Sequence, residues 1–371
     1  MNHKTHSDGS ASVAADPLLH ALIARAIADA GGWLPFDRFM HLALYAPGLG
    51  YYANASRKFG ALPASGSDFI TAPELSPVFG DLLARQVRQA LDATGTHEIW
   101  EFGAGSGALA AQVLGALDQR VRRYTIVDVS GALRARQRER LAAWGERVQW
   151  ADRLPPAIEG VVLGNEVLDA MPVTLLHRVA GVWHERGVAL GEGGAFVWSD
   201  RLTPLRPPVE IAGDHDYLTE IHPQAEGFVR TLAAHLKRGA AFLIDYGFPE
   251  AEYYHPQRDM GTLVCHRAHR VDSDPLVEVG AKDITAHVNF TAMALAAQEA
   301  GMEVLGYASQ GSFLINCGLQ GRLETLGPVE RAQAAKMVME HEMGELFKVL
   351  AVGAGQWEPM GFARGDRTHR L

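Results

Sequence analysis

Short apolar runs alternate with stretches of helical periodicity from residue 97 onward. The runs are EIWEFG (98–103), YTIVDVS (124–130), RVQWAD (147–152), GVVLGNE (160–166) and AAFLIDYG (240–247). Apolar strands that alternate with helices are typical of a parallel, doubly wound α/β sheet, whose strands are buried on both faces. Most of these runs end in acidic residues, and ligands bind at the carboxyl ends of such strands. The pattern therefore predicts an α/β fold with an acidic site at one edge of the sheet.

The N-terminal region shows helical periodicity and then a long polar stretch. Apolar residues at helical spacing over 16–31, with Asp16 at the N-cap and Pro17 at the first helical position, predict a helix. Residues 34–77 predict a further helix and then a loop rich in Gly, Pro and Ser. A loop of this length is uncommon in a compact domain unless it acts as a lid or binding element. Ser76 and Pro77 then begin a helix with one apolar stripe.

Two segments interrupt the alternation of strands and helices. Residues 171–237 predict a small antiparallel meander with a Pro-rich connection, and residues 246–291 are irregular. The tail predicts strands at 301–309 and 345–353, with a capped helix between them, which suits a last strand that pairs antiparallel at the sheet edge. We therefore expect a disordered tail at 1–15, a helical or lid segment at 16–75, and a sheet domain at 76–371 with insertions at about 172–236 and 248–291.

Composition and charge exclude several classes of function. The chain has 371 residues, 34 Lys and Arg, 43 Asp and Glu, and a net charge of −9, which disfavours a nucleic-acid partner. No apolar stretch reaches the roughly 18 residues of a membrane span. Cys265 and Cys317 are too few for a disulfide framework and favour a reducing, cytoplasmic location. The 16 His residues show no HExxH or HxH spacing, so we expect no metal.

A glycine-rich turn follows the first strand of the alternating region. Glu101, Gly103, Gly105 and Gly107 lie between this strand and a helix, where bare backbone allows a ligand to approach a helix N-terminus. A dinucleotide fingerprint would have Gly at position 108, which is Ala here. The turn is compatible with a dinucleotide, with S-adenosyl-L-methionine, or with a tight turn that binds nothing.

Acidic residues end the second and third strands of the region. Asp128 lies 25 residues after Gly103, where a carboxylate can accept hydrogen bonds from both ribose hydroxyls of a nucleoside ligand. The order of Glu before the glycines favours the S-adenosyl-L-methionine pattern. This order is the pattern of class I methyltransferases, and in the fold of those enzymes Asp152, at the end of the third strand, would reach the adenine amino group of the cofactor. The alternative is that Asp128 only caps a helix.

Several longer segments carry a resemblance to a known family. They are SDFITAPELSPVFG (67–80), EFGAGSG (101–107), GNEVLDAMPV (164–173), IDYG (244–247) and DITAHVNFT (283–291). With these segments in this order, the sequence resembles the MidA family of class I methyltransferases, from about residue 17 to 353. The resemblance implies a seven-strand sheet in the order 3-2-1-4-5-7-6 and S-adenosyl-L-methionine as the cofactor. For the mitochondrial members it implies dimethylation of an arginine in a quinone-oxidoreductase subunit.

The segment after the fourth strand departs from those relatives. Where they have Glu-Phe-Phe-Asp, this chain has aliphatic residues between Glu166 and Asp169, so both carboxylates remain and the pocket shape changes. A pair of carboxylates suits a guanidinium group, which keeps its proton in water. The two side chains would point the same way if the chain turns helical here. Alternatively, Asp169 caps a helix and Glu166 is solvated, or Asn165 holds an amino group or a glutamine side chain.

Further candidates lie in the segments specific to the family. Asp68 and Glu74 would belong to a lid over the cofactor, or would be ordinary turn and cap residues. His287 and Asn289, with Tyr246, are candidates for a second wall of the substrate site. Asp283 and Thr285 suggest a helix start, which weakens that role, and a single His is more often structural.

The favoured function is a methyltransferase that acts on a protein, with an arginine side chain as the acceptor. The alternatives are a non-catalytic assembly or scaffold protein that keeps the cofactor fold, a small-molecule methyltransferase, and a dehydrogenase, which Ala108 disfavours. The insertions add surface that an oligomer could use, but no residue pattern supports one.

Overall fold

The centre of the molecule is a twisted sheet with strand order β15-β16-β10-β5-β2-β3-β4, and β14 pairs with β10 off this path. The structure is a computed structural model that describes residues 16–54, 71–128, 130–267 and 270–371. The strands are β2 (Glu98–Phe102), β3 (Arg123–Val127), β4 (Val148–Ala151), β5 (Ile158–Asn165), β10 (Leu236–Phe248), β14 (Val288–Asn289), β15 (Glu303–Ser309) and β16 (Phe347–Gly353).

Pairing directions agree with the class I methyltransferase sheet expected from the resemblance. Strands β4, β3, β2, β5 and β10 run parallel, whereas β16 lies antiparallel between β10 and β15. When β2, β3, β4, β5, β10, β15 and β16 are numbered 1 to 7 along the chain, the strand order of the sheet is 3-2-1-4-5-7-6. The predicted fold class and its antiparallel last strand are therefore confirmed. All five apolar runs of the sequence form strands of this sheet.

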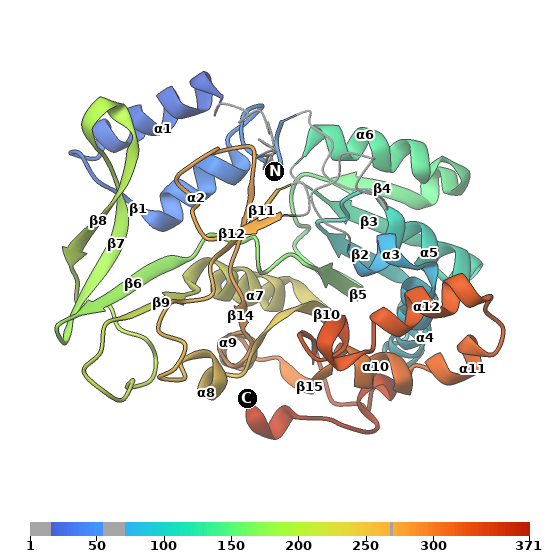
Figure 1. Cartoon of the computed structure of the whole chain (residues 1–371). Helices are drawn as coiled ribbons and strands as arrows, with labels where there is room; N and C mark the ends of the chain where they lie inside the picture. Colours follow the sequence, from blue (N-terminus) through green and yellow to red (C-terminus); the bar gives the residue numbers. More distant parts are fainter. Residues whose placement is uncertain (1–15, 55–70, 129, 268–269) are drawn as a thin grey trace, which may run out of the picture.

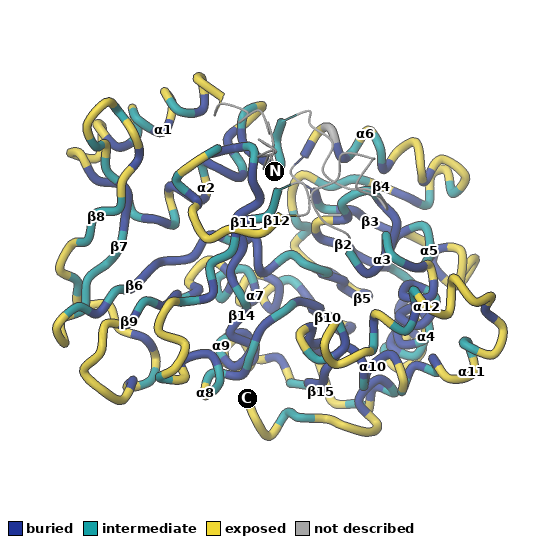
Figure 2. The backbone as a smooth tube through the Cα atoms, in the orientation of Figure 1, coloured by how far each residue is buried: buried dark blue, intermediate teal, exposed yellow. Residues whose placement is uncertain are grey.

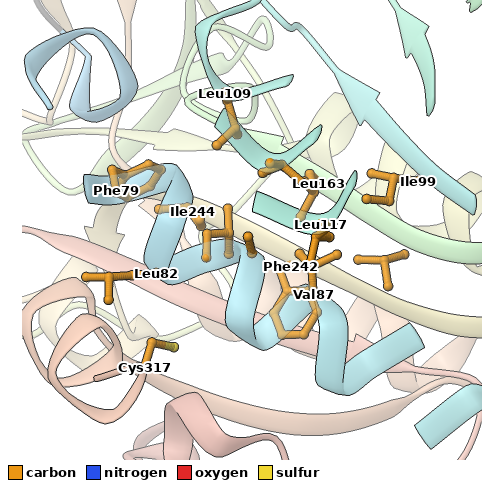
Figure 3. Packing of buried hydrophobic residues seen from close by; sticks show 14 of the residues in the cluster. Phe79, Leu82, Val87, Ile99, Leu109, Leu117, Leu163, Phe242, Ile244 and Cys317 are labelled. Atoms are coloured by element: carbon orange, nitrogen blue, oxygen red, sulfur yellow. The ribbon is translucent and has the colours of Figure 1, made fainter. Parts of the chain in front are cut away.

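Helices cover both faces of the sheet. On one face α4 (Pro77–Thr94), α5 (Ala108–Leu117) and α10 (Gln310–Asn316) bury a large apolar core, part of which Figure 3 shows around Phe242 and Ile244. On the other face α7 (Pro223–His235) and α9 (Phe290–Glu299) pack against the same strands. The strand β16 is buried along its whole length. Figure 2 shows that exposed residues, in yellow, gather in the outer loops and that buried residues, in dark blue, gather in the centre of the molecule.

A second group of elements lies beside the sheet and forms a cover, on the left in Figure 1. Its core joins the N-terminal segment to both interrupting segments. Its elements are α1 (Pro17–Asp29), β1 (Leu34–Pro35), α2 (Phe36–Tyr45), β6 (Thr174–Val179), β7 (Val182–Leu190), β8 (Phe196–Leu202), β9 (Tyr217–Ile221), β11 (Val264–Arg267), β12 (Arg270–Asp272) and β13 (Asp283–Thr285). Segments far apart in the sequence therefore fold together as one cover.

Local sequence patterns predicted the start of two helices and the position of the antiparallel meander. The Asp16 side chain accepts a hydrogen bond from the backbone N–H of Leu18 and begins α1, and Ser76 caps α4 through Val78 N. The predicted meander is present as β6–β9. The helix α7 lies within the range expected for the first insertion, yet it packs on the central sheet and is the crossover helix before β10.

The remaining helices are short or peripheral. They are α3 (Ala72–Leu75), α6 (Gly131–Arg140), α8 (Glu250–Tyr253), α11 (Leu319–Leu323) and α12 (Pro328–Lys336). Among the helices in the described part of the chain, none combines the length and the apolar character that crossing a bilayer requires. The tail expected at 1–15 and much of the expected lid, 55–70, lie outside the described residues.

Candidate functional site

A cavity of about 840 Å³ opens at the carboxyl ends of the central strands. Its lining comes from the carboxyl ends of β2, β3, β5 and β10, from the loops after β2, β3 and β5, and from α2, α3, α7, β11 and β13. The cavity is thus built jointly by the sheet and the cover, where ligands of parallel sheets bind.

The glycine-rich turn forms one wall of this cavity. Gly103, Gly105 and Gly107 have φ angles of +61°, +53° and +80°, a region that other residues rarely adopt, so the turn needs glycine. Gly103 and Gly105 line the cavity directly. Gly107 is the N-cap of α5 and lies near Gln137, so it shapes the turn without lining the cavity.

Glu101 lies at the base of the turn, in β2. Its side chain is buried and its Oε2 accepts a hydrogen bond of 2.7 Å from the Tyr124 hydroxyl. Burial raises the pKa of Glu101 to about 7, because a carboxylate loses hydration inside the protein. Glu101 is also one of the residues that line the cavity, where a cation would favour the ionised form of its carboxyl group.

Asp128 follows β3 and faces the cavity from the side next to the glycine turn. Its Oδ1 accepts from Ser130 N at 2.9 Å and its Oδ2 accepts from Gln137 Nε2 at 2.8 Å. Burial raises the pKa of this carboxyl group, and the two hydrogen bonds oppose the rise. The same Gln137 amide donates to Gly105 O at 2.9 Å, so one side chain fixes Asp128 against the glycine turn.

Asp152 does not reach the cavity, contrary to the sequence-based expectation. Its side chain is 82% exposed and pairs with Arg134, whose guanidinium also donates to Asp128 O and Ala151 O. The arginine holds the carboxylate on the outer surface beyond the end of β4. An adenine contact by Asp152 therefore has no basis in the observed geometry.

Glu74 lines the cavity from α3. Its Oε1 accepts hydrogen bonds from the Ser106 hydroxyl of the glycine turn and from Arg140 Nη1, the latter at 3.1 Å. Gln112 Nε2 also donates to Pro73 O at 2.7 Å, so two bonds attach α3 to α5 and its preceding turn. Asp68, the other candidate in this segment, lies outside the described residues.

The segment after β5 is a non-helical turn, so the helical spacing expected for Glu166 and Asp169 is wrong. Glu166 has φ +53°, and the Oδ2 of Asp245 accepts from the backbone N–H groups of Val167, Leu168 and Asp169 at 2.9–3.3 Å. Those N–H groups point at one carboxylate instead of forming a helix. The alternative reading of Asp169 as a helix cap fails for the same reason.

Asn165, Glu166 and Asp169 nevertheless all line the cavity. Asn165 Nδ2 donates to Glu166 Oε1 at 2.9 Å, and Asp169 Oδ2 accepts from the Tyr246 hydroxyl at 2.5 Å. Burial, and then the charge of Asp169, raise the pKa of Glu166 to about 8, and burial raises the pKa of Asp169 to about 6. Within the described residues, Asn165 Oδ1 and Asp169 Oδ1 are buried acceptors without a donor.

His287 lines the cavity as a neutral ring. Burial lowers its pKa to about 4, and its ring stacks on Phe248 at 5.3 Å between centroids. Residues 283–285 form the strand β13 and not a helix start. The helix α9 begins later, and its N-cap is Asn289, whose side chain accepts from Ala292 N. Asn289 is not part of the cavity lining.

Sequence reasoning missed the contribution of the cover. Tyr52, in the turns after α2, donates to both carboxylate oxygens of Asp283 at 2.8 Å, and its ring stacks on that of Tyr45 at 5.5 Å. All three residues line the cavity. The missed Gln137 had a usable signal, since it is the one uncharged polar residue in the Arg-rich stretch RARQRER. Tyr45, Tyr52 and Asp283 had none, because they meet only through the fold.

The sequence matches one family model over residues 82–308, with the description "Putative S-adenosyl-L-methionine-dependent methyltransferase". The chain is similar to a Burkholderia thailandensis protein whose crystal structure is bound to S-adenosyl-homocysteine. The sequences are 49% identical, the match covers 97% of this chain and 100% of that one, and the TM-score is 0.93.

Two mitochondrial proteins are similar at greater distance. The protein arginine methyltransferase NDUFAF7 homologue of Drosophila melanogaster is 29% identical, over 87% of this chain and 82% of the relative. The human protein arginine methyltransferase NDUFAF7 is 26% identical, over 86% of this chain and 80% of the relative. The similarity thus includes both the sheet and the cover.

Proposed function

The chain belongs to the MidA family of S-adenosyl-L-methionine-dependent methyltransferases, and on that basis we propose that it methylates arginine side chains of a protein. Its cofactor is S-adenosyl-L-methionine, which supplies a methyl group on a positively charged sulfur. The residues of the cavity support an arginine side chain as the methyl acceptor.

The residues around the glycine turn suit this cofactor. Positive φ angles at Gly103 and Gly105 leave bare backbone along one wall, and the buried carboxylate of Asp128 is held next to it by Gln137. We assign Asp128 to the ribose hydroxyls and Glu101 to the cationic amino-acid end, because carboxylates form strong hydrogen bonds with both. Glu74 would close the site from α3.

The observation that carries the acceptor assignment is the pair of buried, unpaired oxygens. Among the described residues, neither Asn165 Oδ1 nor Asp169 Oδ1 has a donor, and leaving a buried acceptor unpaired costs roughly 1–3 kcal/mol. The residues Asn165 and Asp169 that carry these oxygens both line the cavity, as does Glu166. A guanidinium group offers five N–H donors in a plane and no acceptor, which complements such a set.

The same carboxyl groups can manage the proton that methylation releases. With a pKa of about 8, Glu166 is mostly protonated at pH 7, and an arriving guanidinium would favour its ionised form. Asp169, with a pKa of about 6, is mostly ionised at that pH and can accept a hydrogen bond from the attacking nitrogen. Orientation by these groups supports an in-line displacement.

Labelled methyl transfer tests the proposal. The purified chain is incubated with S-adenosyl-[methyl-³H]methionine and a protein extract of a strain that lacks the gene, and the protein is then hydrolysed and its amino acids are separated. We expect label in methylarginine, and loss of that label for Glu166→Gln and Asp169→Asn at unchanged affinity for S-adenosyl-homocysteine.

Other results assign other functions. Label in methylglutamine or methyllysine would favour an acceptor held by Asn165, and label confined to the small-molecule fraction would identify a small-molecule methyltransferase. No transfer to any extract, with the cofactor bound, would favour an assembly protein that keeps the fold. Full activity of both Glu166→Gln and Asp169→Asn would mean that these carboxyl groups do not bind the guanidinium group.

A further inference from the structure

Tyr246 lies near the end of β10 in the central sheet, where two aromatic rings pack against it. Its ring lies edge-on to the ring of His287, at 5.1 Å and 81°, and edge-on to the ring of Phe347, at 5.4 Å and 72°. His287 lies between β13 and β14, and Phe347 begins β16. Two separate segments therefore hold the phenol at the end of β10.

The Tyr246 hydroxyl occupies one oxygen of Asp169 and leaves the other available. It donates to Oδ2 at 2.5 Å, whereas Oδ1 is buried and has no donor among the described residues. A carboxylate held on one side by a short hydrogen bond has one oxygen left for a second donor. Asp169 is one of the residues that line the cavity, so a bound molecule is in a position to supply that donor.

The neighbouring residue of β10 fixes the backbone of the same turn. Asp245 Oδ2 accepts from the N–H groups of Val167, Leu168 and Asp169, and its Oδ1 accepts from Tyr246 N at 3.0 Å. Consecutive residues of one strand thus hold the main chain of the turn and the side chain of Asp169. A movement of β10 would move both.

We propose that Tyr246 is a positioning residue for methyl transfer, which orients Asp169 so that Oδ1 receives an N–H of the acceptor. The inference rests on the proposed arginine methylation, because it requires an acceptor that donates to Asp169. Tyr246 itself touches neither the methyl group nor the attacking nitrogen in this role. Its contribution is to keep Asp169 in one orientation and ionised.

The charges around Asp169 make the hydroxyl important for ionisation. The negative charge of Asp169 raises the pKa of Glu166 in the same turn and of Asp245 in β10. The charge of Asp283 in β13 also raises the pKa of Glu166. The charges of Asp169 and Asp283 both raise the pKa of Tyr45 in α2. His287 is neutral at pH 7. Burial raises the pKa of Asp169, and the Tyr246 hydrogen bond is the main influence that lowers it. Without the hydroxyl, the pKa of Asp169 rises further.

Tyr246→Phe tests this role, with Tyr253→Phe as a matched control. Tyr253 is also buried and donates to a carboxylate, Glu220, at 2.9 Å, but neither residue lines the cavity. Labelled methyl transfer is measured between pH 5.5 and 9. For Tyr246→Phe we expect about a tenfold loss of the saturating rate at pH 6.5, with S-adenosyl-homocysteine affinity unchanged. The acidic limb of its pH–rate profile should move to higher pH. Tyr253→Phe should keep the wild-type limb.

The outcomes separate this inference from the proposed function. If the wild type methylates arginine and the acidic limb of Tyr246→Phe is unmoved, the positioning role is wrong. If the wild type labels no arginine, the proposed function fails first. Should Tyr246→Phe not fold, Phe347→Leu keeps the hydroxyl while loosening the ring, and we expect a smaller shift in the same direction. An unmoved limb in that variant also overturns the role.

Discussion

At the scale of residues, two acids that hold equivalent places in the sequence differ in the structure. Asp128 and Asp152 each follow a parallel strand, yet the first is buried in the cavity wall and the second is 82% exposed in a pair with Arg134. A side chain's direction at a strand end depends on its partners, and these are not encoded by the strand pattern. The sequence thus predicts where acids gather and not which of them face the ligand.

This difference gives a paired prediction for cofactor affinity. Asp128→Asn removes a charged acceptor whose hydrogen bonds are worth about 1.5–3 kcal/mol each, so we expect at least a tenfold weaker affinity for S-adenosyl-homocysteine by isothermal titration calorimetry. Asp152→Asn should bind like the wild type. Equal weakening in both variants would contradict the placement of Asp152 outside the cavity.

The raised pKa of Glu166 predicts how stability changes with pH. A carboxyl group whose pKa rises from 4.5 in the unfolded chain to about 8 in the folded one binds protons more tightly when folded. Its stabilising effect is present below pH 4.5 and is lost as the pH rises toward 8. Without ligand, the melting temperature of Glu166→Gln relative to the wild type should therefore increase from pH 5 to pH 8.

The exposed Glu192 supplies the control for this measurement. The melting-temperature difference between Glu192→Gln and the wild type should stay constant over the same range. A constant difference for Glu166→Gln as well would argue that its carboxyl group is not buried in the ligand-free protein.

At the scale of elements, strands and capped helices were predictable but the turn after β5 was not. The five apolar runs and the caps at Asp16 and Ser76 are local patterns, and each formed the expected element. The conformation of the turn depends on Asp245, which lies 76 residues beyond Asp169 in the sequence. The Asp245 carboxylate accepts hydrogen bonds from three backbone N–H groups of the turn. Tyr45, Tyr52 and Asp283 also meet only in the folded chain, so their contribution to the site could not be predicted from the sequence.

Removing the Asp245 carboxyl group should therefore unfold the turn. Asp245→Ala leaves four N–H groups, three of them in the turn, without this acceptor and also leaves a small cavity, so we expect the free energy of unfolding to fall by about 2–4 kcal/mol in urea titrations. Asp216→Ala, which removes a single bond to Ala180 N in an exposed turn, should cost less than about 1 kcal/mol. Similar costs would show that Asp245 does not organise the turn.

At the scale of the whole molecule, ligand binding should stabilise the sheet and the cover together, since both line the cavity. S-adenosyl-homocysteine at 100 times its Kd adds about 2.7 kcal/mol, which scanning fluorimetry should register as one cooperative shift of several degrees. Gly105→Val should abolish the shift, because valine disfavours φ +53° and adds bulk at the wall. Gly115→Ala, on an open face of α5, should keep it. Two separate transitions would mean that the cover responds alone.

The place of β16 has a consequence for biosynthesis. Residues 347–353 leave the ribosome after every other strand of the central sheet, yet they lie between β10 and β15 and pair with both. Until they emerge, the growing chain carries two strands with unpaired edges, which are sites of aggregation. The central sheet therefore closes only after its last strand has been made, and nascent chains that stop before residue 347 should depend on chaperones to stay in solution.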